Sequence, residues 1–170
     1  MQRFSRIMLG VTAALCLAAS SGAALAQERP LKQQLVGVWT LVSAEAAEPD
    51  GKKMPLVAGA DVKGLLIFTD SGRLSVQVIG EFPKVAANDR MKMTPEEQKR
   101  MAESVLSYFG TYTVDEADKS FTMRIERSSF PNQTGRDTKR MVAFDGDELR
   151  VTNPARLAGG QTNLVWKRAN

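Results

Sequence analysis

The 170-residue sequence contains no histidine. Histidine is the usual general base near neutral pH and the commonest metal ligand in proteins. Its absence excludes Ser-His-Asp and Cys-His catalysis and ordinary zinc sites. Any catalysis would have to use carboxylates, tyrosine, lysine or arginine. We therefore predict no catalytic residue, no metal site and no cofactor from the sequence.

Cysteine is nearly absent too, because the single cysteine, Cys16, lies in a stretch typical of a secretory signal. Residues 1–26 combine Arg3 and Arg6, an apolar core too short to span a bilayer comfortably, and small residues at the cleavage position. The alternative is an uncleaved anchor. We predict a mature chain that starts at Gln27, is periplasmic or secreted, has no stable membrane span, and lacks disulfide and thiol chemistry.

The chain also lacks a strong excess of either charge. Without the two arginines of the signal, 21 of the 23 basic residues remain against 19 acidic ones, a net charge of +2. This balance does not favour a nucleic-acid partner, which needs a clustered basic face. The length supports one domain, with residues 27–34 as a polar lead-in and residues 35–170 as the domain.

What is present is a series of short strands joined by tight turns. In residues 73–80, Leu74, Val76 and Val78 alternate with polar residues, which is typical of a half-buried strand. Asp70-Ser71-Gly72 has the composition of a hairpin turn. The eight predicted strands are residues 38–47, 62–69, 73–80, 110–114, 121–126, 138–144, 149–152 and 162–168, with a further short extended piece at 53–56.

One helix is predicted between the third and fourth strands. Thr94-Pro95-Glu96-Glu97 is a capping box with proline at the first helical position. Apolar residues then recur at helical spacing, which predicts a helix that continues to about residue 109 and packs on the barrel mouth or wall. The residues of this stripe are Met101, Ala102, Val105, Leu106 and Phe109.

Eight sequential strands with short connections favour an all-β fold, an eight-stranded up-and-down antiparallel barrel. Such a barrel is just wide enough to hold side chains or one small ligand. The rival architecture is a β-sandwich.

The sequence resembles the bacterial lipocalin-like domain family over roughly residues 35–167. The matching stretches are residues 35–44 (LVGVWTLVSA), 64–77 (GLLIFTDSGRLSVQ), 94–97 (TPEE), 109–115 (FGTYTVD), 130–132 (FPN) and 145–149 (DGDEL). The resemblance implies a barrel that holds a small apolar or amphipathic molecule, and a first-strand Trp39 that packs under Arg168 near the chain end. It supplies no activity, although some lipocalin-like proteins are isomerases or cyclases. The fifth strand, which often carries histidine in the family, has none here.

Arg140 is the residue whose chemistry best suits ligand recognition. It shares a strand face with Val142 and Phe144. If that face points inward, the guanidinium needs a carboxylate, carbonyl groups or an anionic ligand. Our hypothesis is that Arg140 anchors the acidic head of an amphipathic ligand. The alternative is that the Arg140 guanidinium forms an ion pair inside the barrel, or that Arg140 lies at a strand tip and faces solvent.

Five further residues are candidates for contacting a ligand. Gln77 and Tyr112 are polar residues on otherwise apolar strands, although Tyr112 also fits a core or rim position. Arg124 and Glu126 share the other face of the fifth strand, where pairing with each other or with cross-strand neighbours is the alternative. Asn132 lies at a predicted barrel mouth.

Together these features predict an exported protein that binds a small apolar or amphipathic molecule inside its barrel. Burial of the ligand's apolar surface would contribute about 25 cal/mol of binding free energy per Å². Two alternatives stay open. One is an isomerase or cyclase that uses Tyr112 and Glu126. The other is a plugged barrel that serves as an interaction module. The sequence does not predict the oligomeric state.

Overall fold

The computed structural model of the protein describes residues 29–169. The predicted signal at residues 1–26, with Cys16, and the predicted mature start at Gln27 lie outside this range.

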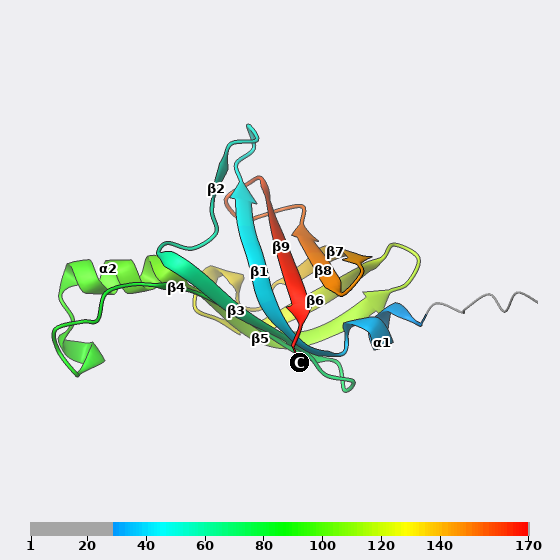
Figure 1. Ribbon diagram of the computed structural model, residues 1–170, viewed down its shortest axis with the longest axis horizontal. Coiled ribbons are helices and arrows are strands. Elements are labelled where there is room, and N and C mark those ends of the chain that lie inside the picture. The colour runs from blue at the N-terminus through cyan, green and yellow to red at the C-terminus, as the bar shows by residue number, and fades with distance from the viewer. Residues whose placement is uncertain (1–28, 170) are drawn as a thin grey trace, which may run out of the picture.

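Within residues 29–169, nine antiparallel strands form one sheet that closes on itself (Figure 1). The strands are β1 (Gly37–Ala47), β2 (Lys53–Pro55), β3 (Ala60–Phe68), β4 (Arg73–Glu81), β5 (Val105–Asp115), β6 (Ser120–Ser128), β7 (Asp137–Asp145), β8 (Glu148–Asn153) and β9 (Gln161–Arg168). Neighbours in sequence pair in turn from β3 to β9, and β1 pairs with both β3 and β9. The fold is therefore the predicted eight-stranded up-and-down barrel, and the β-sandwich is wrong.

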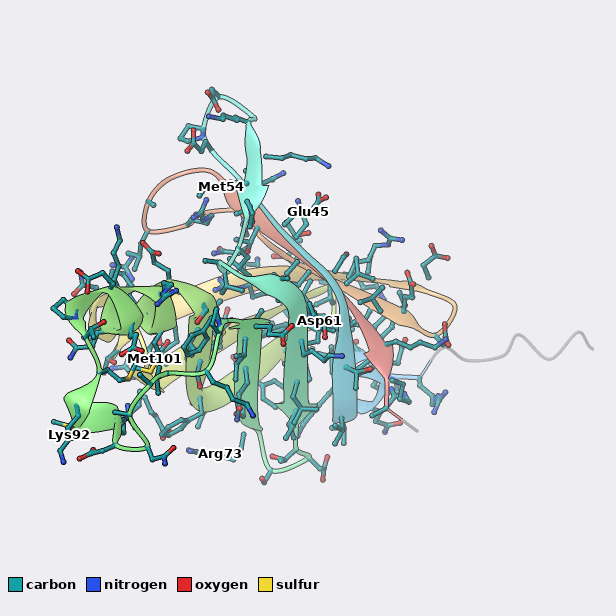
Figure 2. The ribbon with its side chains drawn as sticks, turned by 60° about the vertical axis from the view of Figure 1, so that its left-hand side comes forward. Glu45, Met54, Asp61, Arg73, Lys92 and Met101 are labelled. Atoms are coloured by element: carbon teal, nitrogen blue, oxygen red, sulfur yellow. The ribbon has the colours of Figure 1, made fainter. Side chains whose placement is uncertain are left out.

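The short strand β2 is not one of the eight strands that close the barrel. It pairs only with the last residues of β1, where Lys53 opposes Ala47, and it matches the predicted short extended piece. The end of β1 and β2 extend away from the barrel as an arm that carries Glu45 and Met54 (Figure 2).

The period-two pattern seen in the sequence places the core inside the barrel. In β4, Leu74, Val76 and Val78 are buried, whereas Gln77 between them is exposed. The predicted turn before this strand is made by Gly72 with φ of +82°, a conformation that glycine adopts without steric cost. Alternation of apolar and polar residues thus decides which side chains face the interior.

One end of the barrel is closed by residues that the first and last strands bring together. Trp39 on β1 is 1% exposed, and its indole N–H donates to the Leu35 carbonyl oxygen at 2.8 Å. The Cζ atom of Arg168 lies 4.2 Å from the centre of the Trp39 ring. The predicted packing of Trp39 under Arg168 is confirmed.

A helix that the sequence did not predict covers this closed end. Residues 27–34 were expected to be a polar lead-in, but α1 (Leu31–Leu35) forms there, and Leu31 and Leu35 are buried. The backbone N–H groups of Leu31 and Lys32 donate to the Glu116 carboxylate at 2.8 and 3.3 Å. A five-residue helix shows no periodicity of its own, so only its contact with the barrel stabilises it.

The second helix, α2 (Pro95–Ser104), begins where the sequence predicts. Thr94 Oγ1 accepts from the Glu97 N–H at 3.2 Å, and the Glu97 carboxylate accepts from the Thr94 N–H at 2.9 Å, so the capping box is confirmed. The short 3₁₀ turn η1 (Arg90–Lys92) precedes it. Figure 2 shows η1 with Lys92 and α2 with Met101 standing to one side of the barrel strands.

The predicted end of this helix, near residue 109, is wrong. Residues from Val105 onward belong to β5 and pair with β4, with Val105 opposite Ile79 and Phe109 opposite Ser75. The apolar residues at helical spacing were therefore partly strand residues, and Phe109 lies half-exposed on the outer face. β-Branched and aromatic residues favour strands when a partner strand is present, and that partner is distant in sequence.

Candidate ligand-binding site

The interior of the barrel holds a cavity of about 260 Å³. This is slightly below the size range of typical small-molecule sites, roughly 300–1,000 Å³. Most of the residues in its wall are apolar, and seven strands, β3 to β9, contribute to it. Side chains in this wall include Leu66, Val76, Met123, Val151, Leu164 and Trp166. The plugged-barrel alternative requires an interior filled with side chains, and this cavity shows that the interior is not filled.

The mouth of the cavity lies at the end of the barrel opposite α1. It is bordered by the loop before β3, by the last turn of α2, by the loop between β6 and β7, which contains η2 (Pro131–Gln133), and by the loop between β8 and β9. Mouth residues include Val57, Glu103, Phe130, Gln133, Arg156 and Leu157. Apolar and charged groups therefore share the rim, while most side chains below the rim are apolar.

Arg140 on β7 is the charged residue that lines this cavity from within the wall. It is 8% exposed, and Val142 two residues on is also buried, so the face predicted to carry Arg140 does point inward. Its Nη1 atom donates at 3.0 Å to the Lys139 carbonyl oxygen and at 3.0 Å to Asn153 Oδ1. Both acceptors are neutral.

No carboxylate among residues 29–169 lies within 4 Å of the Arg140 guanidinium. The internal ion pair considered as an alternative is therefore not formed by these residues, and a side chain this buried is not a solvent-facing tip. A buried cation without a counter-charge is costly unless something else neutralises it. The site is therefore electrostatically suited to an anion.

The stagger of the strands explains how Arg140 comes to this position. In register, Arg140 lies opposite Phe121, the second residue of β6, and its side chain reaches Asn153, the last residue of β8. Strands in a barrel are tilted, so a row of paired residues runs obliquely from one end to the other. Arg140 therefore stands between the deep residue Phe121 and the rim residue Asn153.

The sequence of this barrel matches a known family model over residues 36–169, described as a lipocalin-like domain. The protein belongs to the lipocalin-like domain family. A search of curated proteins found no match. Among residues 29–169, no helix has the length and apolar character needed to cross a membrane.

Three solved structures are similar to this lipocalin-like chain at low identity. A redesigned β-barrel is 13% identical with a TM-score of 0.45, and the match covers 84% of this chain and 98% of that one. A lipocalin-like protein from Bacteroides uniformis is 12% identical with a TM-score of 0.42, over 79% and 98% of the two chains. Fatty-acid-binding protein 1 of Echinococcus granulosus is 15% identical with a TM-score of 0.39, over 81% and 99%.

Tyr112, a predicted ligand contact, lies deeper than the cavity of this lipocalin-like barrel. It is 5% exposed and its hydroxyl donates to the Thr69 carbonyl oxygen at 2.8 Å. Burial, and to a lesser degree the charge of Asp70, raise the pKa of Tyr112. Its ring packs edge-on against Phe68, with centroids 4.9 Å apart. The core position considered for Tyr112 is the one it occupies.

Three other predicted contacts lie on the outer face of the barrel. Gln77 is exposed on β4. Arg124 pairs with Asp137 at 3.1 Å, and Glu126 accepts two hydrogen bonds from Arg73 at 2.5 and 2.9 Å. Those hydrogen bonds hold the pKa of Glu126 below its usual value. Arg124 thus pairs with its direct cross-strand neighbour, whereas Glu126 pairs with Arg73 on β4, two strands away. Glu126 faces away from the buried Tyr112, with which it was grouped as an enzyme candidate.

Asn132, the sixth predicted contact, is exposed in η2 at the rim, and it is its neighbour Gln133 that borders the cavity. Among the described residues, no cluster of three acidic side chains is close enough to hold a metal ion. Arg140 is thus the one predicted contact whose side chain lines the cavity.

Apart from Arg140, the polar residues of the cavity were missed by the sequence reasoning, and two of them carried a signal that could have found them. Tyr108 lines the wall and is 9% exposed, but it lay inside the range predicted as helix. Asn153 follows Leu149 and Val151 at a spacing of two, so its inward direction was readable from the pattern. Extending the alternation seen in β5 back from Tyr112 would have found Tyr108.

Proposed function

We propose that this protein is an exported binding protein that holds a small amphipathic acid inside its barrel, with the acidic head against Arg140. The observation that carries the proposal is a buried guanidinium, without a carboxylate partner among residues 29–169, in the wall of a cavity whose lining is mostly apolar below its rim. Arginine binds carboxylates and phosphates through paired hydrogen bonds, which are stronger than those between neutral groups.

The two parts of the ligand make different contributions in this proposal. The tail leaves water and contacts side chains such as Leu66, Val76 and Met123, which contributes about 25 cal/mol per Å² of buried apolar area. The head supplies the negative charge that Arg140 lacks, and Asn153 holds the guanidinium in place for it. Affinity then follows from burial of the tail, and selectivity for an acid follows from Arg140.

Export belongs to the same proposal. It is supported by the N-terminal segment, whose two arginines, apolar core and small residues are typical of a cleaved signal. A binding protein outside the cytoplasm has no reducing system around it, which suits a chain whose single cysteine precedes the barrel. Mass determination of the mature protein from its own host tests this part: a mass matching a chain that begins at Gln27 supports it, and the full-length mass contradicts it.

The test of the acid site compares two ligands that differ only in the head. Isothermal titration calorimetry measures decanoate and 1-decanol binding to the wild type and to Arg140→Met. We expect the wild type to prefer decanoate, and Arg140→Met to lose about tenfold or more for decanoate alone, because a hydrogen bond to a charged group contributes about 1.5–3 kcal/mol. The matched control is Arg124→Met, which removes an arginine from the outer face of the neighbouring strand. Equal decanoate affinity in Arg140→Met and wild type would contradict the proposal.

A further inference from the structure

A second arginine lines the same cavity as Arg140. Arg156 lies at the mouth, in the loop between β8 and β9, and is partly buried. Its Nη1 atom donates to the Ala47 carbonyl oxygen at 3.4 Å. Among residues 29–169, no carboxylate oxygen lies within 4 Å of this guanidinium either. In the described part of the chain, the cavity lining thus holds two arginines whose partners are neutral oxygens.

Asn153 joins the two arginines on one side of the cavity. Its Oδ1 atom accepts from Arg140 Nη1 at 3.0 Å. The same atom accepts at 3.2 Å from the backbone N–H of Ala155, the residue before Arg156. One oxygen atom therefore holds both the guanidinium of Arg140 and the backbone from which Arg156 projects.

A row of paired residues continues from Asn153 to the carbonyl group that holds Arg156. Thr162 on β9 lies opposite Asn153 on β8 and opposite Ala46 on β1, the residue before Ala47. Thr162 is 6% exposed and lines the cavity. Neighbouring strands lie about 4.8 Å apart, so β8 and β1 are about 10 Å apart on either side of β9. The two guanidinium groups, one held at Asn153 and the other at Ala47, therefore flank Thr162 at a spacing that one anionic group can bridge.

The cavity lining does not itself neutralise these two cations. Among the described residues, Glu103 on α2 is the one acidic residue of the lining, and its carboxylate lies 3.9 Å from Lys99 on the same helix. A carboxylate head on the ligand would neutralise one arginine and leave the other without a counter-charge. A phosphate monoester carries nearly two negative charges near neutral pH and has three acceptor oxygens, so it can accept from both guanidinium groups and from Thr162.

We propose that the preferred head group is a doubly charged phosphate monoester, bound between Arg140 and Arg156 and attached to a short apolar tail. This rests on the proposed function and deepens it, because it names the class of acid. Arg140 attracts any acidic head, and Arg156 distinguishes a dianion from a monoanion. Two cations close together in a poorly solvated cavity repel each other, and a dianion between them offsets that repulsion.

The experiment compares decyl phosphate with decyl sulfate, which have the same tail and tetrahedral heads of different charge. Isothermal titration calorimetry at about pH 8 uses the full mature chain and each ligand below its critical micelle concentration. The phosphate is then a dianion, because its second pKa is about 6, whereas the sulfate carries one charge. We expect the wild type to bind decyl phosphate at least about tenfold more tightly.

The variants of Arg156 test where this preference comes from. Arg156→Met should remove it and should weaken decyl sulfate binding less than about threefold, because Arg140 still binds a single charge. Arg156→Lys should keep most of the preference, since lysine retains the positive charge. The matched control is Arg136→Met, which removes an exposed arginine between η2 and β7 that does not line the cavity, and it should leave the preference unchanged.

Two kinds of failure are distinguishable. Equal affinity for the two ligands in the wild type, or a preference that Arg156→Met reduces no more than Arg136→Met does, would overturn the inference and leave the Arg140 site standing. Failure of decyl phosphate, decyl sulfate and decanoate alike to bind, or binding that ignores Arg140→Met, would instead refute the proposed function.

Discussion

The Cζ atom of Arg168 lies 4.2 Å from the centre of the Trp39 ring, so the last strand of the barrel is joined to the first by a cation–π contact. The same guanidinium donates to the backbone oxygens of Gln34 at 2.7 Å and Val36 at 3.0 Å. Trp39 in turn donates to the Leu35 carbonyl oxygen. These two side chains therefore connect β9, β1 and the segment that carries α1, and they close the end opposite the cavity mouth.

Trp39→Ala should lower the free energy of unfolding by about 3–5 kcal/mol, because it removes a large side chain that is 1% exposed. Arg168→Met should cost about 1–2 kcal/mol, since Arg168 is largely exposed and loses one cation–π contact and two hydrogen bonds. Urea unfolding measures both. Lys167→Met, next to Arg168, is the control; it breaks only an exposed ion pair with Asp147 and should change stability by less than about 1 kcal/mol. An unchanged midpoint in Trp39→Ala would refute its placement in the core.

Leu35→Ala tests whether α1 is part of the fold or a loose extension. Leu35 is 0% exposed against the closed end of the barrel, so its truncation should destabilise the whole domain by about 2–5 kcal/mol. Hydrogen exchange of the Leu31 N–H, which donates to Glu116, should also become faster. Gln33→Ala, an exposed change in the same helix, is the control. If Leu35→Ala unfolds at the wild-type urea concentration, α1 contributes nothing to the barrel.

Tyr112→Phe tests whether the Tyr112 hydroxyl serves the core of the barrel or contacts the ligand. The change removes the hydrogen bond to the Thr69 carbonyl oxygen and leaves the ring in place, so we expect a stability loss of about 0.5–1.5 kcal/mol. The affinity for decanoate should not change, because Tyr112 is not among the residues that line the cavity. Calorimetry and urea unfolding of the same sample decide this. A tenfold loss of decanoate affinity would mean that Tyr112 contacts the ligand after all.

The pair formed by Arg73 and Glu126 should be visible in the titration of Glu126. The hydrogen bonds from Arg73 lower the pKa of Glu126. A carboxyl with a lower pKa in the folded chain stabilises the fold above its unfolded-state pKa, and this contribution is lost as the pH falls through the folded-state pKa. Carboxyl NMR should show the pKa of Glu126 rising toward its ordinary value in Arg73→Met and not in Arg124→Met, which breaks a different pair. No difference between the two variants would contradict the assignment.

Local patterns in the sequence were enough to predict most of the fold. The alternation around Val76, the turn at Gly72 and the capping box at Thr94 depend on neighbours in sequence, and each is found where the pattern places it. The end of α2 depended on the pairing of Val105 with Ile79, a contact between distant residues, and a local pattern does not reveal it. α1 was missed for the same reason.

The candidate site was less accessible to sequence reasoning. Alternation placed Arg140 on one strand face with Val142 and Phe144 but did not decide whether that face points inward, and the depth at which Arg140 lies depends on the stagger of the strands. That stagger brings Arg140 against Phe121 and Asn153, which are separated from it in sequence. Polarity alone was misleading for Tyr112, because its hydroxyl is satisfied by a backbone oxygen within the core.

The most direct test of the account is an NMR titration of decanoate, labelled with ¹³C at its carboxyl carbon, bound to the wild-type protein. Contact with the Arg140 cation favours the ionised carboxylate, whereas burial in an apolar cavity without a cation favours the neutral acid. The account predicts that the bound carboxyl has a pKa below that of free decanoate and that Arg140→Met abolishes this decrease. A bound carboxyl whose pKa equals or exceeds that of the free acid would contradict it.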